Sequence, residues 1–380
     1  MNNNHTKNLF EYNRRKTLEV NVGDIPMGGN NPIRVQSMTN TNTLDTQKTV
    51  EQIIKLVNLG CEYVRIATAN IYEAENLKNI KKELRNKGYQ TPLIADVHFN
   101  PQVALIAAEI VEKVRINPGN YESGKDSIAE RLFPLLKICK QNGTAIRIGI
   151  NHGSLSERII NQYGNTAFGM AKSAMEYVQI CNDFGFHNLV LSMKASDTRI
   201  MVQSVRLLVD MLDEKKWYYP LHLGVTEAGN GEYGRIKSAI GIGTLLQDGL
   251  GDTIRVSLTE NPENEIPFAL DILQACGLRY NKAEFISCPS CGRTQYNIEE
   301  FLEVIKQKTS HLKGLKIGVM GCIVNGPGEM ADADYGFVGA GKNKITLYKG
   351  KNPIYKNLDI ENAVDMLIQL IKENGDWRDD

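Results

Sequence analysis

The sequence predicts an α/β fold, a (β/α)8 barrel of the TIM type, followed by a smaller α+β domain. Eight short β-rich runs alternate with amphipathic helical stretches between residues 33 and 276. The alternation covers about 245 residues, which is the size of such a barrel. After Cys276 the chain becomes richer in polar residues, glycine and paired cysteines. We therefore expect a barrel domain with an N-terminal hairpin over residues 1–276 and a second domain over residues 277–380.

The eight runs have the Val, Ile and Leu content of parallel strands that are covered on both faces. They lie at 33–38, 63–68, 93–98, 113–118, 145–151, 188–194, 221–227 and 253–258. Helical stretches such as 45–60 and 197–214 begin at an Asp that suits the N-cap position. A doubly wound open sheet is the alternative, but eight regular units without a Gly-rich dinucleotide-binding turn favour the barrel.

Both ends of the predicted barrel are flanked by short elements. The stretch 18–28 predicts a small hairpin around Gly23 and Asp24, which we expect to cover the bottom of the barrel. Beyond the barrel, a helix is expected near 298–309, strands at 315–321, 333–341 and 344–350, and a closing helix over 360–375. These elements define the second domain.

Composition narrows the class of protein. Lys+Arg and Asp+Glu are both 44, so the formal net charge is zero, which argues against a nucleic-acid or membrane-surface binder. No apolar run approaches the roughly 20 residues of a membrane span. The first 16 residues are polar and basic and lack the apolar core of a signal peptide. We expect a cytoplasmic protein.

Four predicted strands contain an arginine between β-branched residues, where a guanidinium is costly to bury unpaired. The cations of these strands, with the lysine that ends another, are Arg65, Arg115, Arg147, Arg255 and Lys194. Pairing of each arginine with a strand carboxylate is the structural alternative, but Asp96 and Glu227 are too few to neutralise five cations. The surplus predicts an anion at the carboxyl ends of the strands, and several guanidinium groups suit more than one phosphate.

Other polar residues collect at the same strand ends. Asn151 and Ser257 follow two of the arginine-containing runs, and His98 stands two residues after Asp96. Asp96, His98 and Glu227 are candidates for acid/base or positioning roles. A histidine at a strand end is often structural, but its spacing from Asp96 favours a role in the site.

The seven cysteines fall into two groups. Cys61, Cys139, Cys181 and Cys276 are scattered in helix-like apolar patterns and are expected to be small buried hydrophobes. Cys288 and Cys291 have a C-x-x-C spacing that zinc, iron–sulfur clusters and redox dithiols all use, and Cys322 follows 31 residues on. Three thiolates leave one position open on a four-iron cluster, which usually has four cysteine ligands.

Glu329 is the candidate for that fourth position. A carboxylate oxygen is a poor match among soft sulfur ligands, so it suits a ligand that a substrate displaces. Asn325-Gly326-Pro327-Gly328 separates Cys322 from Glu329, and its mix of flexible and stiff residues predicts a tight turn. Two alternatives remain: a buried Cys322 with a surface Glu329, or structural zinc bound by three cysteines and one glutamate.

Together these segments resemble the bacterial 4-hydroxy-3-methylbut-2-enyl diphosphate synthase family in its two-domain form, which catalyses the penultimate step of the non-mevalonate isoprenoid pathway. The resemblance runs essentially from end to end. Its motifs lie at 35–45, 94–99, 114–120, 146–155, 191–197, 221–229, 251–262, 287–295 and 321–329.

The resemblance implies an oxidoreductase of terpenoid biosynthesis with an α+β iron–sulfur domain after the TIM barrel. The implied reaction is reductive ring opening and dehydration of 2-C-methyl-D-erythritol 2,4-cyclodiphosphate to (E)-4-hydroxy-3-methylbut-2-enyl diphosphate. Two electrons would enter one at a time through a [4Fe–4S] cluster. The implied cluster ligands are Cys288, Cys291, Cys322 and Glu329. The implied diphosphate ligands are Arg65, Arg115, Arg147, Lys194, Arg255 and Ser257, with Asn151 beside them.

Asp96, His98 and Glu227 would face the reacting carbons, with Glu227 as the candidate proton donor. Members of the family are homodimers in which the cluster domain of one chain closes over the barrel of the other, and flavodoxin or ferredoxin supplies the electrons. The mechanism that we expect begins when a substrate oxygen displaces Glu329 from iron. One departure from the family pattern is His152, where a small residue is expected.

Two rival functions differ in class. One is a non-redox barrel enzyme for a phosphorylated substrate, with structural zinc on the three cysteines. The other is a zinc-dependent nucleic-acid-binding or scaffold protein, which the neutral net charge and the confinement of the arginines to strands oppose.

Overall fold

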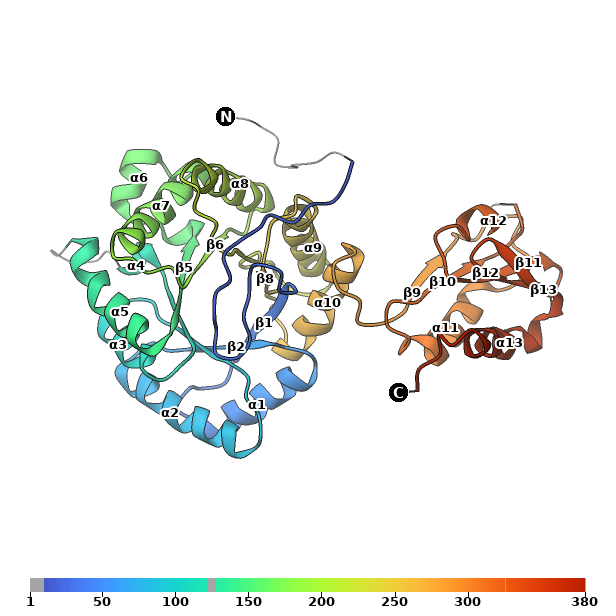
Figure 1. Ribbon diagram of the computed structural model, residues 1–380, viewed down its shortest axis with the longest axis horizontal. Helices are drawn as coiled ribbons and strands as arrows, with labels where there is room; N and C mark the ends of the chain where they lie inside the picture. The colour runs from blue at the N-terminus through green and yellow to red at the C-terminus, as the bar shows by residue number, and fades with distance from the viewer. Residues whose placement is uncertain (1–9, 122–126, 325, 380) are drawn as a thin grey trace. The chain divides into compact units, whose positions relative to one another are not determined.

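The computed structural model of the chain describes residues 10–121, 127–324 and 326–379 and divides into two compact units, Met1–Arg279 and Tyr280–Asp380 (Figure 1). Residues 1–9 of the polar N-terminal stretch and Asn325 of the expected turn lie outside the described residues.

The first unit is a parallel barrel, which confirms the predicted fold class. Its strands are β1 (Arg34–Met38), β2 (Tyr63–Ala67), β3 (Leu93–Asp96), β4 (Lys113–Ile116), β5 (Ala145–Asn151), β6 (Leu189–Lys194), β7 (His222–Leu223) and β8 (Thr253–Ile254). They are ordered β6-β5-β4-β3-β2-β1-β8-β7, and a parallel bridge between Leu191 and Leu221 joins the two ends of this sheet. The strands therefore close on themselves, as a barrel requires.

Helices alternate with the strands along the chain. They are α1 (Thr46–Asn58), α2 (Ile71–Asn86), α3 (Pro101–Ala108), α4 (Pro118–Tyr121), α5 (Ile128–Asn142), α6 (Glu157–Tyr163), α7 (Ala167–Asp183), α8 (Thr198–Glu214), α9 (Gly231–Gln247) and α10 (Glu265–Ala275), with short 3-10 turns η1 (His152–Ser154) and η2 (Pro262–Asn264). Asp45 and Asp197 cap α1 and α8 by accepting backbone N–H groups of the first turn, as the sequence predicts.

β7 and β8 are shorter than the predicted strands 221–227 and 253–258. The backbone N–H of Arg255 still donates to Leu223 O at 2.9 Å, but beyond this hydrogen bond the two segments no longer pair as strands. They continue as loops that bond to each other and to the loop after β6, through Thr226 N to Ala195 O and Thr259 N to Gly229 O. The residues that were predicted to extend β7 and β8 therefore form loops above the carboxyl ends of the strands.

The amino-terminal end of the barrel is closed by the segment expected to be a hairpin. Val20 and Met27 form an antiparallel bridge, and both pack in one apolar cluster with Tyr63 and Ile94 of the strands. The Tyr63 hydroxyl also donates to the carbonyl of Ile25 at 2.5 Å. This apolar floor leaves the carboxyl ends of the strands as the open face of the barrel interior.

The second unit is a mixed five-stranded sheet with helices. Its strands are β9 (Glu284–Ser287), β10 (Lys316–Met320), β11 (Tyr335–Gly341), β12 (Lys344–Lys349) and β13 (Asn352–Asp359), in the order β13-β12-β11-β10-β9. β9, β10 and β11 are parallel neighbours, whereas β11, β12 and β13 are antiparallel. The helices α11 (Ile298–Thr309) and α13 (Ile360–Glu373) share an apolar core with the sheet, and α12 (Gly326–Glu329) is a single turn.

β9 and β13 were not predicted from the sequence. β13 is exposed along most of its length and carries Pro353 and several polar residues, so it lacks the alternation that identifies a half-buried strand. As an edge strand it needs only one partner, β12. Among the described residues, no helix is both long and apolar enough to cross a membrane.

Candidate active site

The register of the barrel places the predicted charged residues side by side. Asp96 pairs with Arg115 across β3 and β4, and Arg115 pairs with Arg147 across β4 and β5. Asn151 pairs with Lys194 across β5 and β6. Alternate residues of a strand face the same side, so these side chains are presented to one face of the barrel wall. We call Arg65, Arg115, Arg147, Lys194 and Arg255 the anion cradle.

Asp96 is the central carboxylate of the cradle. Arg115 Nη1 donates to Asp96 Oδ1 at 3.1 Å, and Arg65 Nε lies 3.7 Å from Asp96 Oδ2. Burial alone would raise the pKa of Asp96, but Arg65 and Arg115, with a hydrogen bond from His98, hold it well below its usual value. Asp96 is therefore an ionised carboxylate that positions arginines, and it is not suited to donate a proton near neutral pH.

His98 lies at the edge of the same network. Its Nε2 is 3.3 Å from Asp96 Oδ2 and 3.1 Å from Arg115 Nη1. Its Nδ1 is 3.4 Å from the side-chain amide nitrogen of Asn120. The ring is therefore held on both nitrogens, beside the carboxylate that the sequence spacing associated with it.

Arg255 is held by a carboxylate that sequence reasoning missed. Its Nε lies 3.4 Å from Oε2 of Glu265, the buried first residue of α10. Glu265 also accepts from Ser37 Oγ at 2.8 Å and from the backbone of Leu258 at 3.1 Å. Two good hydrogen bonds thus fix the carboxylate, while its bonds to the guanidinium are long. Arg255 retains capacity for a further acceptor.

A methionine sulfur separates two cradle arginines. Arg65 Nε lies 3.1 Å from Met38 Sδ, and Arg255 Nη1 lies 3.5 Å from the same atom. A thioether is a weak, neutral acceptor, so it orients both groups without neutralising either.

Arg147 and Lys194 have no carboxylate partner among the described residues. Arg147 donates to Ser192 Oγ at 2.7 Å, but its Nε and Nη2 have no hydrogen-bond partner in that part of the chain. Burial, followed by repulsion from Arg65 and Arg115, lowers the pKa of Arg147 well below its usual value. Burial and the cradle arginines lower the pKa of Lys194 in the same way. The lowered pKa values of Arg147 and Lys194 both reflect repulsion among the positive charges of the site.

Two glycines make room for these cations. A Cβ on Gly149 would lie 2.6 Å from Arg115 Nε, and one on Gly224 would lie 2.9 Å from Lys194 Nζ. Any larger residue would displace the charged group or its strand. The cradle thus contains five cations against two carboxylates, Asp96 and Glu265, among the described residues. The arrangement can bind a multiply charged anion.

Glu227, Asn151 and Ser257 lie near the carboxyl ends of β7, β5 and β8. Asn151 and Ser257 are half-buried, whereas Glu227 is exposed in the loop after β7. Glu227 has a φ of +53°, in the left-handed region that non-glycine residues seldom adopt. Such strain costs on the order of 1 kcal/mol and concentrates at functional sites.

His152, the departure from the family pattern, makes its hydrogen bond to a loop residue and not to a residue of the cradle. It begins η1, and its Nε2 lies 3.1 Å from the carbonyl of Asn165, which precedes α7. The ring therefore ties two parts of the loop region together.

The three cysteines among the predicted cluster ligands lie on loops of the second unit. β9 and β10 run parallel, so Cys288 and Cys322, which follow their last residues, leave the sheet at the same edge. Gly321 N donates to Cys288 Sγ at 3.2 Å, and Gln295 N donates to Gly321 O at 3.1 Å. Cys291 is exposed in the connecting loop. An N–H bond to sulfur stabilises a thiolate and tunes a cluster that it binds.

Glu329 ends the short helix α12 and is exposed. Gly326 is required at the start of this helix because a Cβ there would lie 2.5 Å from Val338 Cγ1. Among the described residues, no group of three or more His, Cys, Asp or Glu side chains converges into a metal-binding arrangement. The donor set nevertheless fits an iron–sulfur cluster in its chemistry, because soft thiolates dominate it and one of them already accepts an N–H bond.

The remaining cysteines behave as buried small residues. Cys61, Cys139 and Cys181 are buried, Cys276 is half-buried, and none of the four is in a disulfide. Burial is the first cause that raises the pKa of each of these thiols. They are therefore protonated near neutral pH.

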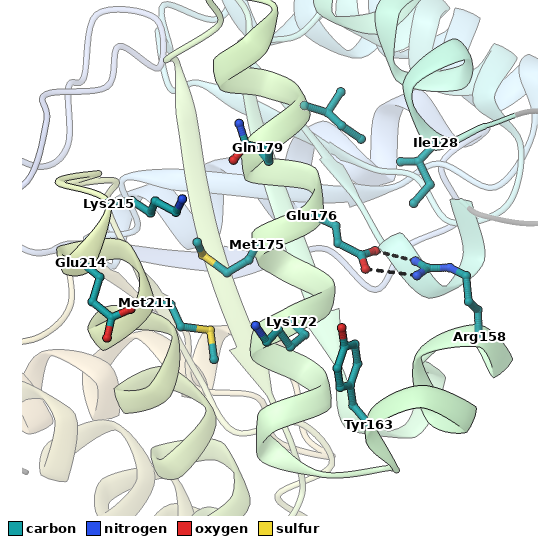
Figure 2. Close-up of a pocket in the computed structure, with 11 residues that line it drawn as sticks. Ile128, Arg158, Tyr163, Lys172, Met175, Glu176, Gln179, Met211, Glu214 and Lys215 are labelled. Atoms are coloured by element: carbon teal, nitrogen blue, oxygen red, sulfur yellow. Dashed lines mark hydrogen bonds and ion pairs between the residues drawn. The ribbon is translucent and has the colours of Figure 1, made fainter. Parts of the chain in front are cut away.

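Figure 2 shows a hollow in the helical layer of the barrel. It is lined by residues of α5, α6, α7 and α8, and Arg158 and Glu176 are joined across it by two hydrogen bonds. None of the predicted site residues lines it. The charged interior of the barrel, and not this hollow, is the candidate active site.

Comparison with known proteins gives consistent matches to both units. The GcpE TIM-barrel domain matches residues 17–270, and the GcpE protein C-terminal domain matches residues 284–373. A protein of Synechococcus sp. (strain CC9902), named 4-hydroxy-3-methylbut-2-en-1-yl diphosphate synthase (ferredoxin), is 52% identical over 97% of this chain and 96% of its own.

A protein of the same name from Prochlorococcus marinus subsp. pastoris (strain CCMP1986 / NIES-2087 / MED4) is 51% identical over 96% of this chain and 95% of its own. Among solved structures, dihydropteroate synthase from Stenotrophomonas maltophilia has a TM-score of 0.48 at 13% identity, over 68% of this chain and 98% of that chain.

Proposed function

This chain belongs to the GcpE family, and we propose that it is a 4-hydroxy-3-methylbut-2-enyl diphosphate synthase of the non-mevalonate pathway. Its substrate would be 2-C-methyl-D-erythritol 2,4-cyclodiphosphate, and its product (E)-4-hydroxy-3-methylbut-2-enyl diphosphate. The reaction is a two-electron reduction that opens the ring and releases water. The observation that carries the proposal is the anion cradle, in which cations outnumber carboxylates.

The cradle suits a diphosphate in number and in geometry. Arg147 and Lys194 lack carboxylate partners among the described residues, and Arg255 holds its partner only loosely. Guanidinium groups bind phosphate oxygens through paired N–H donors, so each can take an oxygen of the substrate. Ser257 and Asn151 would add neutral donors at the same strand ends. The cradle would thereby fix both phosphates while the ring opens.

Asp96 has a positioning role in this proposal. It keeps Arg65 and Arg115 oriented through its ion pairs and leaves their remaining N–H groups to the substrate. His98, which belongs to the same network, would face the carbon skeleton of the substrate. Glu227, exposed and on a strained backbone, is the candidate proton donor. Because Asp96 stays ionised, it is not the proton donor in this proposal.

We propose that Cys288, Cys291 and Cys322 hold a [4Fe–4S] cluster, with Glu329 as a fourth ligand that exchanges. When bound, the cluster would supply the two electrons one at a time. Carboxylate oxygen binds iron less well than the thiolates around it, so Glu329 would be the most weakly held of the four ligands. Gly321, through its N–H, would hold Cys288 as a thiolate.

A ferredoxin is the proposed electron donor because the relatives named above carry that word in their names, and flavodoxin is the alternative. We also propose a homodimer in which the barrel of one chain works with the cluster of its partner. Co-expression of Arg147→Met with Cys322→Ala chains tests this arrangement. Mixed dimers should recover part of the activity that neither variant has alone, and no recovery would contradict a shared active site.

Anaerobic turnover tests the function itself. Full-length protein with its cluster, given the cyclodiphosphate and a reduced one-electron donor, should form one product molecule for every two electrons consumed. Mass spectrometry identifies the product, and Arg147→Met is the matched control that lacks one cradle cation. Brown protein that converts no substrate would contradict the proposal. Colourless zinc protein with full activity on another phosphorylated substrate would favour the non-redox rival.

A further inference from the structure

Beneath the anion cradle the barrel contains a second, smaller set of buried polar side chains. Lys113, the first residue of β4, and His222, the first residue of β7, are both 0% exposed. Lys113 Nζ and both ring nitrogens of His222 have no hydrogen-bond partner among the described residues, and neither has the side-chain amide of Gln36. Leaving such groups unpaired costs about 1–3 kcal/mol each, so retaining them calls for an explanation.

The register places Lys113 directly below the cradle. Lys113 and Arg115 are two residues apart on β4, so their side chains share one face of the barrel wall. Arg115 pairs with Arg147 at the cradle, and Lys113 lies one step nearer the closed end. Its Nζ is 4.7 Å from the centre of the Tyr63 ring, which belongs to the apolar floor. Lys113 thus stands between the floor and the arginines.

The groups around Lys113 are cationic or neutral. Burial first, then repulsion from Arg147 and Arg65, lowers its pKa well below the usual lysine value. Burial raises the pKa of Tyr63, so the phenol beneath the amine is uncharged. Burial and nearby cations lower the pKa of His222.

The carboxylates of the cradle do not compensate Lys113. Asp96 is bonded to Arg65 and Arg115, and Glu265 is bonded to Arg255 and Ser37. Burial without an acidic partner favours the uncharged amine. Lys113 is therefore a buried amine whose charged form is disfavoured by burial and by the repulsion of its cationic neighbours.

We propose that Lys113 couples anion binding to proton uptake: when a diphosphate binds in the cradle, the Lys113 amine gains one proton from the buffer and adds a charge beneath the bound anion. The inference rests on the proposed function only in placing a diphosphate in the cradle. An anion beside Arg147 and Arg65 offsets their repulsion of Lys113, which makes protonation easier. Lys113 is a positioning residue, because it acts through the electrostatic field and touches no substrate.

Linkage makes the coupling reciprocal. If the bound anion favours protonated Lys113, then protonated Lys113 favours the bound anion by the same factor. The affinity of the protein for the anion should then fall as pH rises, because fewer molecules carry the extra proton. Removing the amine should flatten this dependence.

Calorimetry with inorganic pyrophosphate tests the inference on the full chain with its cluster, without need of turnover. Titrations in two buffers of different ionisation enthalpy give the protons taken up on binding. Wild type should take up more protons than Lys113→Met, by up to about one per chain, because only wild type has the buried amine. The ligand's own protonation largely cancels in this difference. Lys48→Met removes an exposed lysine instead, and should match wild type.

Lys113→Met should keep its melting temperature or raise it, since it removes an unpartnered buried amine. The same titration with Lys113→Gln, which retains a polar group, shows whether the result depends on how the methionine packs. Equal proton uptake by wild type and a folded Lys113 variant would overturn the inference and leave the cradle standing. No binding of pyrophosphate by wild type would overturn both the inference and the diphosphate site on which it rests.

Discussion

The barrel and the second unit hold their candidate functional residues in opposite ways. The cradle side chains come mainly from strands, and the register of β3, β4 and β5 sets Asp96, Arg115 and Arg147 beside one another. The predicted cluster ligands lie in loops or, for Glu329, in the single helical turn α12, and Cys291 and Glu329 are exposed. The backbone hydrogen bonds of the fold set the first group of residues side by side, whereas in the second unit they bring together only the strand ends that precede Cys288 and Cys322.

The difference follows from what each site must bind. An anion cradle is made of like charges, and only a rigid frame holds those together against their repulsion. Thiolate ligands are gathered by the metal itself, because binding energy orders the loop that carries them. The second unit needs only to bring the loops of Cys288 and Cys322 to one sheet edge, which the parallel pairing of β9 with β10 does.

The largest expected effect comes from removing a thiolate. Cys322→Ala should lose most of its iron and sulfide and reduce turnover by more than about 1,000-fold, because two thiolates hold a four-iron cluster poorly. Iron and sulfide analysis after anaerobic purification measures the loss. Cys276→Ala is the matched control, since this half-buried cysteine is expected to bind no metal. Full iron content in Cys322→Ala would contradict its role as a ligand.

Glu329→Ala should separate ligation from turnover. Three thiolates remain, so the variant should retain cluster, but turnover should fall roughly 100-fold, on the order of 2.7 kcal/mol in the activation barrier. Glu329→Asp, which keeps the carboxylate on a shorter arm, should recover part of the rate. The measurement is turnover per cluster with a reduced one-electron donor. Wild-type rates in Glu329→Ala would show that this carboxylate has no catalytic part.

Asp96→Asn should weaken the frame of the cradle. Removing the charge leaves Arg65 and Arg115 buried without it, which should lower the free energy of unfolding by about 3 kcal/mol near pH 7. Urea unfolding measures the change, and Asp24→Asn, at a turn outside the cradle, serves as the control. An unchanged free energy of unfolding would mean that the arginines find compensation elsewhere.

The same variant has a definite pH dependence. The folded pKa of Asp96 is depressed, so its stabilisation is fully present above the ordinary Asp pKa of about 3.9 and is lost as pH falls through the folded pKa. The stability gap between wild type and Asp96→Asn should therefore be constant near neutrality and shrink only in acid. If the difference in free energy of unfolding already shrinks within about one pH unit of neutrality, a group other than Asp96 is responsible for it.

The smallest expected effect concerns space in the cradle. Gly149→Ala places a methyl group against Arg115 Nε, and the arginine must shift to admit it. We expect a loss of pyrophosphate affinity of about tenfold, or 1.4 kcal/mol, with iron content unchanged. Gly153→Ala, where a Cβ would meet nothing within 4 Å, is the matched control. Equal losses in both variants would refute a steric role for Gly149.

The sequence was sufficient for the barrel and for much of the cradle because these features have local signals. Runs with Val, Ile and Leu at regular spacing predicted the strands, and an arginine between β-branched neighbours marked four of the five cradle positions. The same logic predicted Asp96, because a carboxylate within a strand is as conspicuous as an arginine. The cluster ligands are predicted by spacing and by family resemblance, and their roles stay predictions.

Other parts of the site had no such signal. Glu265 begins a helix ten residues after Arg255, where an acidic residue is ordinary, and only the folded chain brings its carboxylate to the arginine. Gly149 and Gly224 matter because a side chain at either position would collide with a cation of the cradle, and no sequence pattern indicates this. Lys113 starts a strand, where a lysine suggests an exposed end and gives no hint of complete burial.

The most direct test of the contrast between the two regions is the affinity for inorganic pyrophosphate before and after the cluster is removed. If the fold alone assembles the cradle, the protein with and without cluster should bind pyrophosphate with dissociation constants that agree within about threefold, or 0.6 kcal/mol. Removal of Arg147 in the cluster-free protein should then abolish binding. Loss of pyrophosphate binding on cluster removal, in protein that remains folded, would contradict the account.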